Sequence, residues 1–183
     1  MNIIKTDIEG PFIVEPRVFG DARGYFYESF SVRDFFAATG LVVTFVQDNE
    51  SRSTYGVVRG LHFQLPPYAQ SKLVRVVEGI VLDVAVDIRR GSATYGQHVA
   101  VELSADNKRQ FFIPKGFAHG FAVLSETATF QYKCDEYYHP EAEGAIAWND
   151  LALAIDWRIP TDAVLLSDKD RHHPMFNQFT SPF

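Results

Sequence analysis

The sequence predicts an all-β sandwich or barrel with short peripheral helices. Turn residues recur between short runs rich in Val, Ile, Phe and Tyr, which is the spacing of antiparallel strands and not of alternating strands and helices. The runs that fit a strand cover residues 42–51, 57–64, 72–78, 80–89, 97–104, 109–114, 119–125 and 127–135.

The run over residues 80–89 has the clearest strand pattern. Its even-numbered positions from Leu82 to Ile88 are all aliphatic, whereas the other face alternates Val81 and Ala85 with two aspartates. One face is therefore wholly apolar, and we expect this strand to pack against the core.

A complete set of helix signals occurs once, over residues 31–38. Ser31 can cap the first turn, Asp34 lies three residues later in the capping-box position, and Gly40 can end the helix. The segment after Pro160 can form a further short helical turn.

Length and composition predict one domain over residues 1–183. The chain has 183 residues, of which 46% are hydrophobic and 22% charged, which is enough for one core and short for two. The formal charge of -6 and the pI near 5.5 argue against a nucleic-acid partner, although a local basic pocket for a small anion is compatible with them.

Targeting and cysteine signals predict a cytoplasmic protein. Cys134 is the only cysteine, which excludes an intrachain disulfide and a Cys-rich zinc site. The first residues lack the pattern of a signal peptide, and no apolar run approaches the roughly 18 residues of a membrane span.

Four side chains that can move or stabilise charge lie within apolar, strand-like runs. These residues are His62, Lys72, His119 and Tyr132. Taken singly, each has an ordinary interpretation, such as a hydrogen-bonded core histidine or a buried aromatic residue. Together, a base, a cation, a second imidazole and a phenol suit a proton-transfer site.

The alternation of strand side chains raises a difficulty for Arg59. In an unbroken strand, Arg59 and His62 face opposite sides and cannot share a pocket. Gly60 lies between them, and a glycine within a strand often marks a β-bulge near a functional site. We therefore expect a bulge at Gly60.

The chain resembles the dTDP-4-dehydrorhamnose 3,5-epimerase family, whose members are jelly-roll, cupin-like enzymes of nucleotide-sugar metabolism. The resemblance extends over nearly the whole chain. It rests on residues 15–24 (EPRVFGDARG), 45–49 (FVQDN), 59–62 (RGLH), 113–121 (IPKGFAHGF), 148–150 (WND) and 166–170 (LSDKD).

This resemblance implies epimerisation at C3 and C5 of dTDP-4-dehydro-6-deoxy-D-glucose, in dTDP-L-rhamnose biosynthesis. Both carbons flank the C4 ketone, so a base must act together with a group that stabilises the enolate oxygen. The family pattern makes His62 the base, Lys72 the cation, Tyr132 the proton donor on the opposite face, and Asp170 the carboxylate that orients His62.

The resemblance also implies a set of substrate-binding residues. Arginine suits a diphosphate because its planar fork donates two parallel hydrogen bonds. Tyr138 matches the aromatic residue that stacks on thymine, and Phe19 and Phe121 match pocket walls. The other expected contacts are Arg23, Glu28, Gln47, Asp48, Asn49, Arg59, His119, Glu143 and Lys169.

Alternative functions from the same and from other classes remain open. The same His, Lys and Tyr could serve an enzyme that epimerises C3 alone, or one that moves the ketone between C3 and C4. A non-catalytic jelly-roll module would not need a base and an acid facing each other.

A metal-dependent cupin oxygenase is a less favoured alternative. Residues 114–119 resemble the second metal-ligand motif of cupins, but residues 62–64 (HFQ) lack the second histidine of a His-x-His motif. Lys72 would also repel a metal ion. We expect no metal and no cofactor.

The family pattern further implies a homodimer in which N-terminal strands are exchanged. An exposed edge strand is a liability that such an exchange would cover. Arg23 and Glu28 are then the residues expected to reach the partner's pocket. No membrane or nucleic-acid partner is expected.

Overall fold

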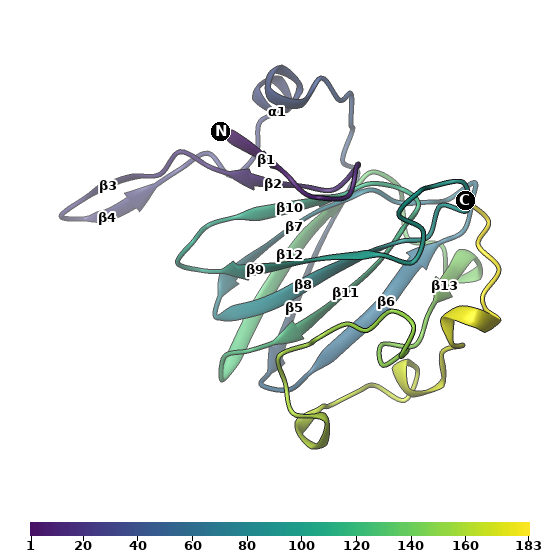
Figure 1. Ribbon diagram of the computed structural model, residues 1–183. Coiled ribbons are helices and arrows are strands. Elements are labelled where there is room, and N and C mark those ends of the chain that lie inside the picture. Colours follow the sequence, from purple (N-terminus) through teal and green to yellow (C-terminus); the bar gives the residue numbers. More distant parts are fainter.

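The computed structural model describes residues 1–183 and contains two antiparallel sheets packed face to face (Figure 1). The six-stranded sheet has the order β1 (Asn2–Lys5), β2 (Phe12–Glu15), β10 (Gln110–Ile113), β7 (Lys72–Glu78), β12 (Thr127–Cys134) and β5 (Gln47–Thr54). The five-stranded sheet has the order β13 (Glu143–Ala145), β6 (Val58–Gln64), β11 (Phe117–Val123), β8 (Ile80–Asp87) and β9 (His98–Ser104). The predicted all-β sandwich is confirmed.

Helical structure is short and peripheral, as expected. The helix α1 (Val32–Thr39) is capped by the side chain of Ser31, which accepts a hydrogen bond from the Asp34 amide, and ends at Gly40 in the left-handed region. Single 3-10 turns cover Pro140–Ala142, Thr161–Ala163, Asp170–His172 and Phe176–Gln178. None of these helices has the length and apolar character needed to cross a membrane.

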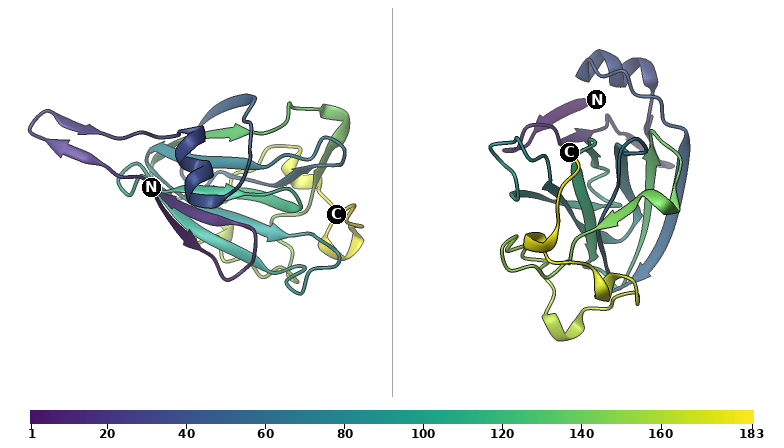
Figure 2. Two further views of the ribbon diagram at one scale, coloured as in Figure 1. Left: turned by 90° about the horizontal axis from the view of Figure 1, so that it is seen from above. Right: turned by 90° about the vertical axis from the view of Figure 1, so that its right-hand side faces the viewer.

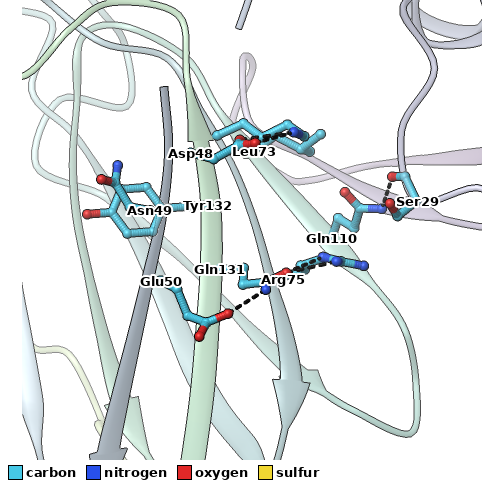
Figure 3. Close-up of a pocket in the computed structure, with 10 residues that line it drawn as sticks. Ser29, Asp48, Asn49, Glu50, Leu73, Arg75, Gln110, Gln131 and Tyr132 are labelled. Carbon is cyan, nitrogen blue, oxygen red and sulfur yellow. Dashed lines mark hydrogen bonds and ion pairs between the residues drawn. The ribbon is translucent and has the colours of Figure 1, made fainter. Parts of the chain in front are cut away.

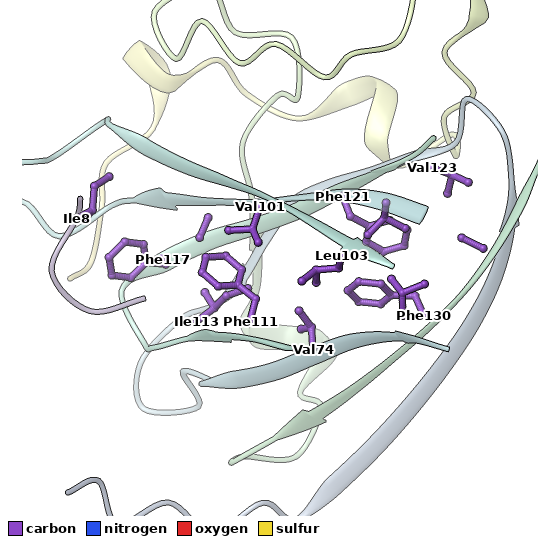
Figure 4. Packing of buried hydrophobic residues seen from close by; sticks show 14 residues of the cluster. Ile8, Val74, Val101, Leu103, Phe111, Ile113, Phe117, Phe121, Val123 and Phe130 are labelled. Atoms are coloured by element: carbon purple, nitrogen blue, oxygen red, sulfur yellow. The ribbon is translucent and has the colours of Figure 1, made fainter. Parts of the chain in front are cut away.

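The main core lies between the two sheets. Phe111 and Phe130 of the six-stranded sheet meet Phe117, Phe121 and other residues of the five-stranded sheet there (Figure 4). The strand β8 is buried on both faces, because Leu82, Val84, Val86 and Ile88 belong to a second cluster that the C-terminal segment covers. A third cluster packs α1 against the outer face of the six-stranded sheet through Phe35, Leu73 and Phe112.

The strand expected over residues 42–51 is partly wrong. The strand β5 begins at Gln47 and continues to Thr54, while Val43 and Phe45 precede it and pack against the cluster around Phe35. Their apolar character therefore reflects contact with α1 and not membership of the sheet. The strands β1, β2 and β13, and the hairpin formed by β3 (Phe19–Asp21) and β4 (Gly24–Phe26), are not predicted by the sequence pattern.

The β3–β4 hairpin projects away from the sandwich (Figure 2). Its aromatic side chains are exposed, with Phe19, Tyr25 and Phe26 at 52%, 62% and 71% of their full accessibility. Exposed apolar groups on a projecting element are typical of an interaction surface.

The expected bulge at Gly60 is confirmed. His62 pairs with His119 in the ladder, but Arg59 pairs with Phe121, so β6 takes one more residue than β11 over this interval. Val58 and Leu61 consequently share the outer cluster, and Arg59 and His62 share the inner face. Gly60 has a φ of +135°, and a Cβ atom there would lie 2.5 Å from the Cα of Gly120.

Candidate active site

A cavity of about 310 Å³ lies between the two sheets, beyond the end of the main core. Its volume is at the lower end of the range for small-molecule sites. Strands β5, β7 and β12 contribute residues from one sheet, and β6 and β13 contribute from the other. The lining residues are Gln47, Asn49, His62, Phe63, Gln64, Gln70, Lys72, Tyr132, Cys134, Tyr138 and Glu143.

A buried carboxylate holds the imidazole of His62. Nε2 of His62 lies 2.6 Å from Oδ1 of Asp170, and the Ser167 hydroxyl donates to Oδ2 at 2.7 Å. Burial favours neutral Asp170, but the hydrogen bonds from His62 and Ser167 prevail and hold its pKa well below the ordinary value. Because an ionised carboxylate only accepts hydrogen bonds, Nε2 of His62 donates, and Nδ1 carries the lone pair that can take up a proton.

A second His-Asp pair lies directly behind the first. His119 is the ladder partner of His62, and its Nε2 lies 3.0 Å from both carboxylate oxygens of Asp83. Burial lowers the pKa of His119, and the charge of Asp83 opposes this effect. His119 therefore forms a buried, hydrogen-bonded wall beside His62.

Lys72 and Tyr132 enter the cavity from the sheet opposite His62. Nζ of Lys72 lies 6.0 Å from the centre of the Tyr132 ring. Burial lowers the pKa of Lys72 and raises the pKa of Tyr132, which is also raised by Cys134 and lowered by Arg59. The phenol is thereby kept in its protonated form, as a proton donor requires.

Polar groups at the rim of the cavity form hydrogen bonds and an ion pair with one another. The backbone amide of Tyr138 donates to Oε1 of Gln47 at 2.9 Å, and the Tyr138 hydroxyl donates to Oε2 of Glu143 at 3.1 Å. Lys169 forms an ion pair with the same carboxylate. The Tyr138 ring is half exposed, which leaves a face for an aromatic ligand.

Several residues expected to bind substrate lie outside this cavity. Asp48 is exposed and pairs with Lys133 on the outer face of the six-stranded sheet, while Phe121 is stacked on Phe130 in the main core. Arg59 lines a neighbouring hollow next to Asp170 and donates to Ser53. Phe19, Arg23 and Glu28 lie on or just after the projecting hairpin and are exposed. His119 and Lys169 do not line the cavity either.

A second hollow, of about 260 Å³, lies on the outer face of the six-stranded sheet (Figure 3). Here Gln131 donates to Glu50 and accepts from Arg75, which also donates to Tyr27. Figure 3 shows the hydrogen bonds that join Glu50, Gln131 and Arg75, with the ring of Tyr132 apart from them. Because its carboxylates already bond to Gln131 and Lys133 and it contains no histidine, we assign the chemistry to the cavity between the sheets.

Sequence reasoning missed three polar residues of the site. Asp83 was recognised only as part of a strand face, although an aspartate in an otherwise apolar strand is itself a signal of a buried partner. Ser167 and His173 both contact Asp170, but they lie in the irregular C-terminal segment, where no periodicity predicts a direction.

The geometry suits a class of enzyme that transfers protons at a carbon next to a carbonyl group. A histidine held by a buried carboxylate faces the same cavity as a lysine and a protonated phenol from the opposite sheet. A family model described as dTDP-4-dehydrorhamnose 3,5-epimerase matches residues 5–178. The chain belongs to this family and is an epimerase, as the sequence predicted.

Individual relatives agree with the family model. An Escherichia coli K12 protein called dTDP-4-dehydrorhamnose 3,5-epimerase is 59% identical over 170 residues, which cover 93% of this chain and 91% of the relative. A crystal structure of a 3,5-epimerase from Legionella pneumophila with dTDP-4-keto-L-rhamnose is 54% identical, has a TM-score of 0.94, and overlaps 98% of this chain and 94% of that one. A 3'-monoepimerase from Streptomyces bikiniensis with dTDP-quinovose is 34% identical, with a TM-score of 0.87 over 94% and 86% of the two chains.

Proposed function

We propose that this chain converts dTDP-4-dehydro-6-deoxy-D-glucose into dTDP-4-dehydro-L-rhamnose by inverting C3 and C5. The observation that carries this proposal is the placement of His62 and Tyr132 on opposite sheets around one cavity. Inversion needs a proton to leave one face of the sugar and another to arrive at the opposite face, and a single base cannot do both directly.

His62 begins each inversion. Its Nδ1 lone pair takes the proton from the carbon next to the C4 ketone, and the bonding electrons move onto the ketone oxygen. Lys72 stabilises the negative charge on that oxygen. Burial lowers the pKa of Lys72, but the nearby Asp83 and Glu143 favour its charged form, and a cation in a partly dehydrated cavity interacts with the oxygen more strongly than in water. The Tyr132 hydroxyl then protonates the carbon from the other side, and the ketone is restored.

The rim of the cavity suits the nucleotide half of the substrate. The half-exposed Tyr138 ring offers a stacking surface for thymine, and Gln47 fixes the backbone that carries it. Lys169, which pairs with Glu143 at the rim, and Arg59, which lines the neighbouring hollow with Asp170, can neutralise a diphosphate.

Epimerisation at C3 alone is the second candidate, favoured by the likeness to the 3'-monoepimerase. Incubation of the 4-keto sugar nucleotide with the enzyme in heavy water separates the two functions. We expect deuterium at both C3 and C5 of the product, which is seen as loss of both proton signals in its NMR spectrum. Deuterium at C3 only would reject the two-centre reaction.

We further propose that the active form is a homodimer in which the β3–β4 hairpins are exchanged. The hairpin exposes three aromatic side chains, and Arg23 lies at its tip, away from the cavity of its own chain. In a two-fold dimer, each hairpin can bring Arg23 and Phe19 to the other subunit's cavity.

Mixing two inactive variants tests this exchange. His62→Ala and Arg23→Ala homodimers should each be weak, because every site lacks one residue. If Arg23 acts across the interface, a mixed dimer contains one intact site, and random mixing should restore about a quarter of the native activity. No recovery after subunit mixing, or a monomer by light scattering, would contradict the exchange.

We propose that residues 1–183 work as one domain, in the cytoplasm. Support for one domain comes from the site itself, whose residues extend from Gln47 to Asp170 and surround one cavity. The buried free thiol of Cys134 is consistent with a reducing compartment.

A further inference from the structure

A second histidine reaches the carboxylate that holds His62. His173 places Nε2 3.2 Å from Oδ1 of Asp170, the oxygen that also lies 2.6 Å from Nε2 of His62. The two imidazole rings stand edge to face, with 5.5 Å between their centres. The side chains of His173 and Asp170 are only 11% and 5% exposed, so the three groups converge at a largely buried point.

We propose that His62, Asp170 and His173 form a binding site for a divalent transition-metal ion, with Zn²⁺ as the best fit. Their ligand atoms all lie within 4.8 Å of one another. Small side-chain rotations can bring them around one ion at bond lengths of about 2.0–2.2 Å. Two imidazoles and a carboxylate suit zinc and its neighbours, whereas Mg²⁺ and Ca²⁺ prefer oxygen ligands.

The site differs from a cupin metal centre in where its ligands arise. Only His62 comes from a strand, and the other two ligands lie within a few residues of each other in the C-terminal segment. Lys72 lines the same cavity, and Lys169 precedes Asp170. Because both cations reduce the attraction for a metal ion, we expect a dissociable ion and not a permanent one.

Metal binding at this site would inhibit the reaction, and this consequence rests on the proposed role of His62. In the metal-free site, Nε2 carries the proton of the neutral ring and Nδ1 carries the lone pair. An ion bound to Nε2 forces the single proton onto Nδ1, which can then accept nothing from the substrate. Zinc would therefore block the base without displacing it from the cavity.

Calorimetric titration of ZnCl₂ into substrate-free protein tests the binding. His173→Gln removes a ligand, and His172→Gln is the matched control, because His172 is exposed and bonds only to the backbone of Asp168. We expect one ion per chain in the native protein and in the control. In His173→Gln we expect zinc affinity at least about tenfold lower, because even loss of an outer-shell partner of a metal site costs about 10- to 100-fold. Should that variant melt early, His173→Phe keeps the ring volume.

Activity measurements provide the second readout. Each protein's inhibition by ZnCl₂ is compared with its own metal-free rate, with MgCl₂ as the control salt and EDTA to reverse the effect. Equal zinc affinity in the native and His173→Gln proteins, or a native protein that takes up no zinc, would overturn the site. Calorimetry needs no catalysis, so failure of the proposed epimerisation would leave this result intact.

Discussion

Replacing His62 with Ala is expected to lower kcat for the 4-keto sugar nucleotide by about 100- to 10,000-fold, the range for loss of a general base. The reason is geometric, because His62 is the only histidine that lines the cavity. His119, its neighbour, is also hydrogen-bonded to a carboxylate, Asp83, but it is buried and does not line the cavity. Initial rates measured at saturating substrate give kcat directly.

The same variant should also lose solvent exchange. Without a base, no proton leaves the sugar, so deuterium from heavy water should enter neither C3 nor C5. The exposed His172→Gln variant is the control for substitution of a histidine, and the melting temperature reports on folding. Native-like exchange in His62→Ala would show that another group is the base.

Local signals predicted the fold where they were strong and failed where tertiary contacts decided. The helix α1 agrees with prediction because Ser31 and Gly40 are local signals for the start and the end of a helix, and neither depends on the rest of the chain. The predicted boundaries of β5 began too early, because this edge strand is polar and has little hydrophobic periodicity. The apolar residues Val43 and Phe45 precede it and pack against the cluster around Phe35 of α1.

The candidate site was only partly predictable for a similar reason. His62, Lys72 and Tyr132 stood out because polar residues in apolar strands are unusual, and Gly60 signalled the bulge that brings Arg59 to the same face. Asp170 came from the family resemblance alone. Asp170 lies in the irregular C-terminal segment, 108 residues after His62. Sequence spacing alone cannot predict that two residues so far apart in the chain are in contact.

Tyr132→Phe is expected to separate proton exchange from inversion. His62 can still remove the proton in this variant and return a solvent deuteron to the same face, because a protonated imidazole exchanges with water. Inversion should fall by about 100- to 10,000-fold, as for loss of a general acid, while deuterium still enters the sugar with its configuration retained. NMR of the recovered substrate measures both outcomes in one sample.

Removal of the hydroxyl should leave the fold unchanged. The ring of Tyr132 packs beside Phe130 at 6.0 Å between centres, and phenylalanine preserves this contact. Phe130→Leu, which alters the same packing and keeps the phenol, is the matched control and should lose stability while keeping its ratio of exchange to inversion. If Tyr132→Phe instead lost exchange and inversion together, the phenol would act before the enolate forms, and delivery from the opposite face would have to come from another group.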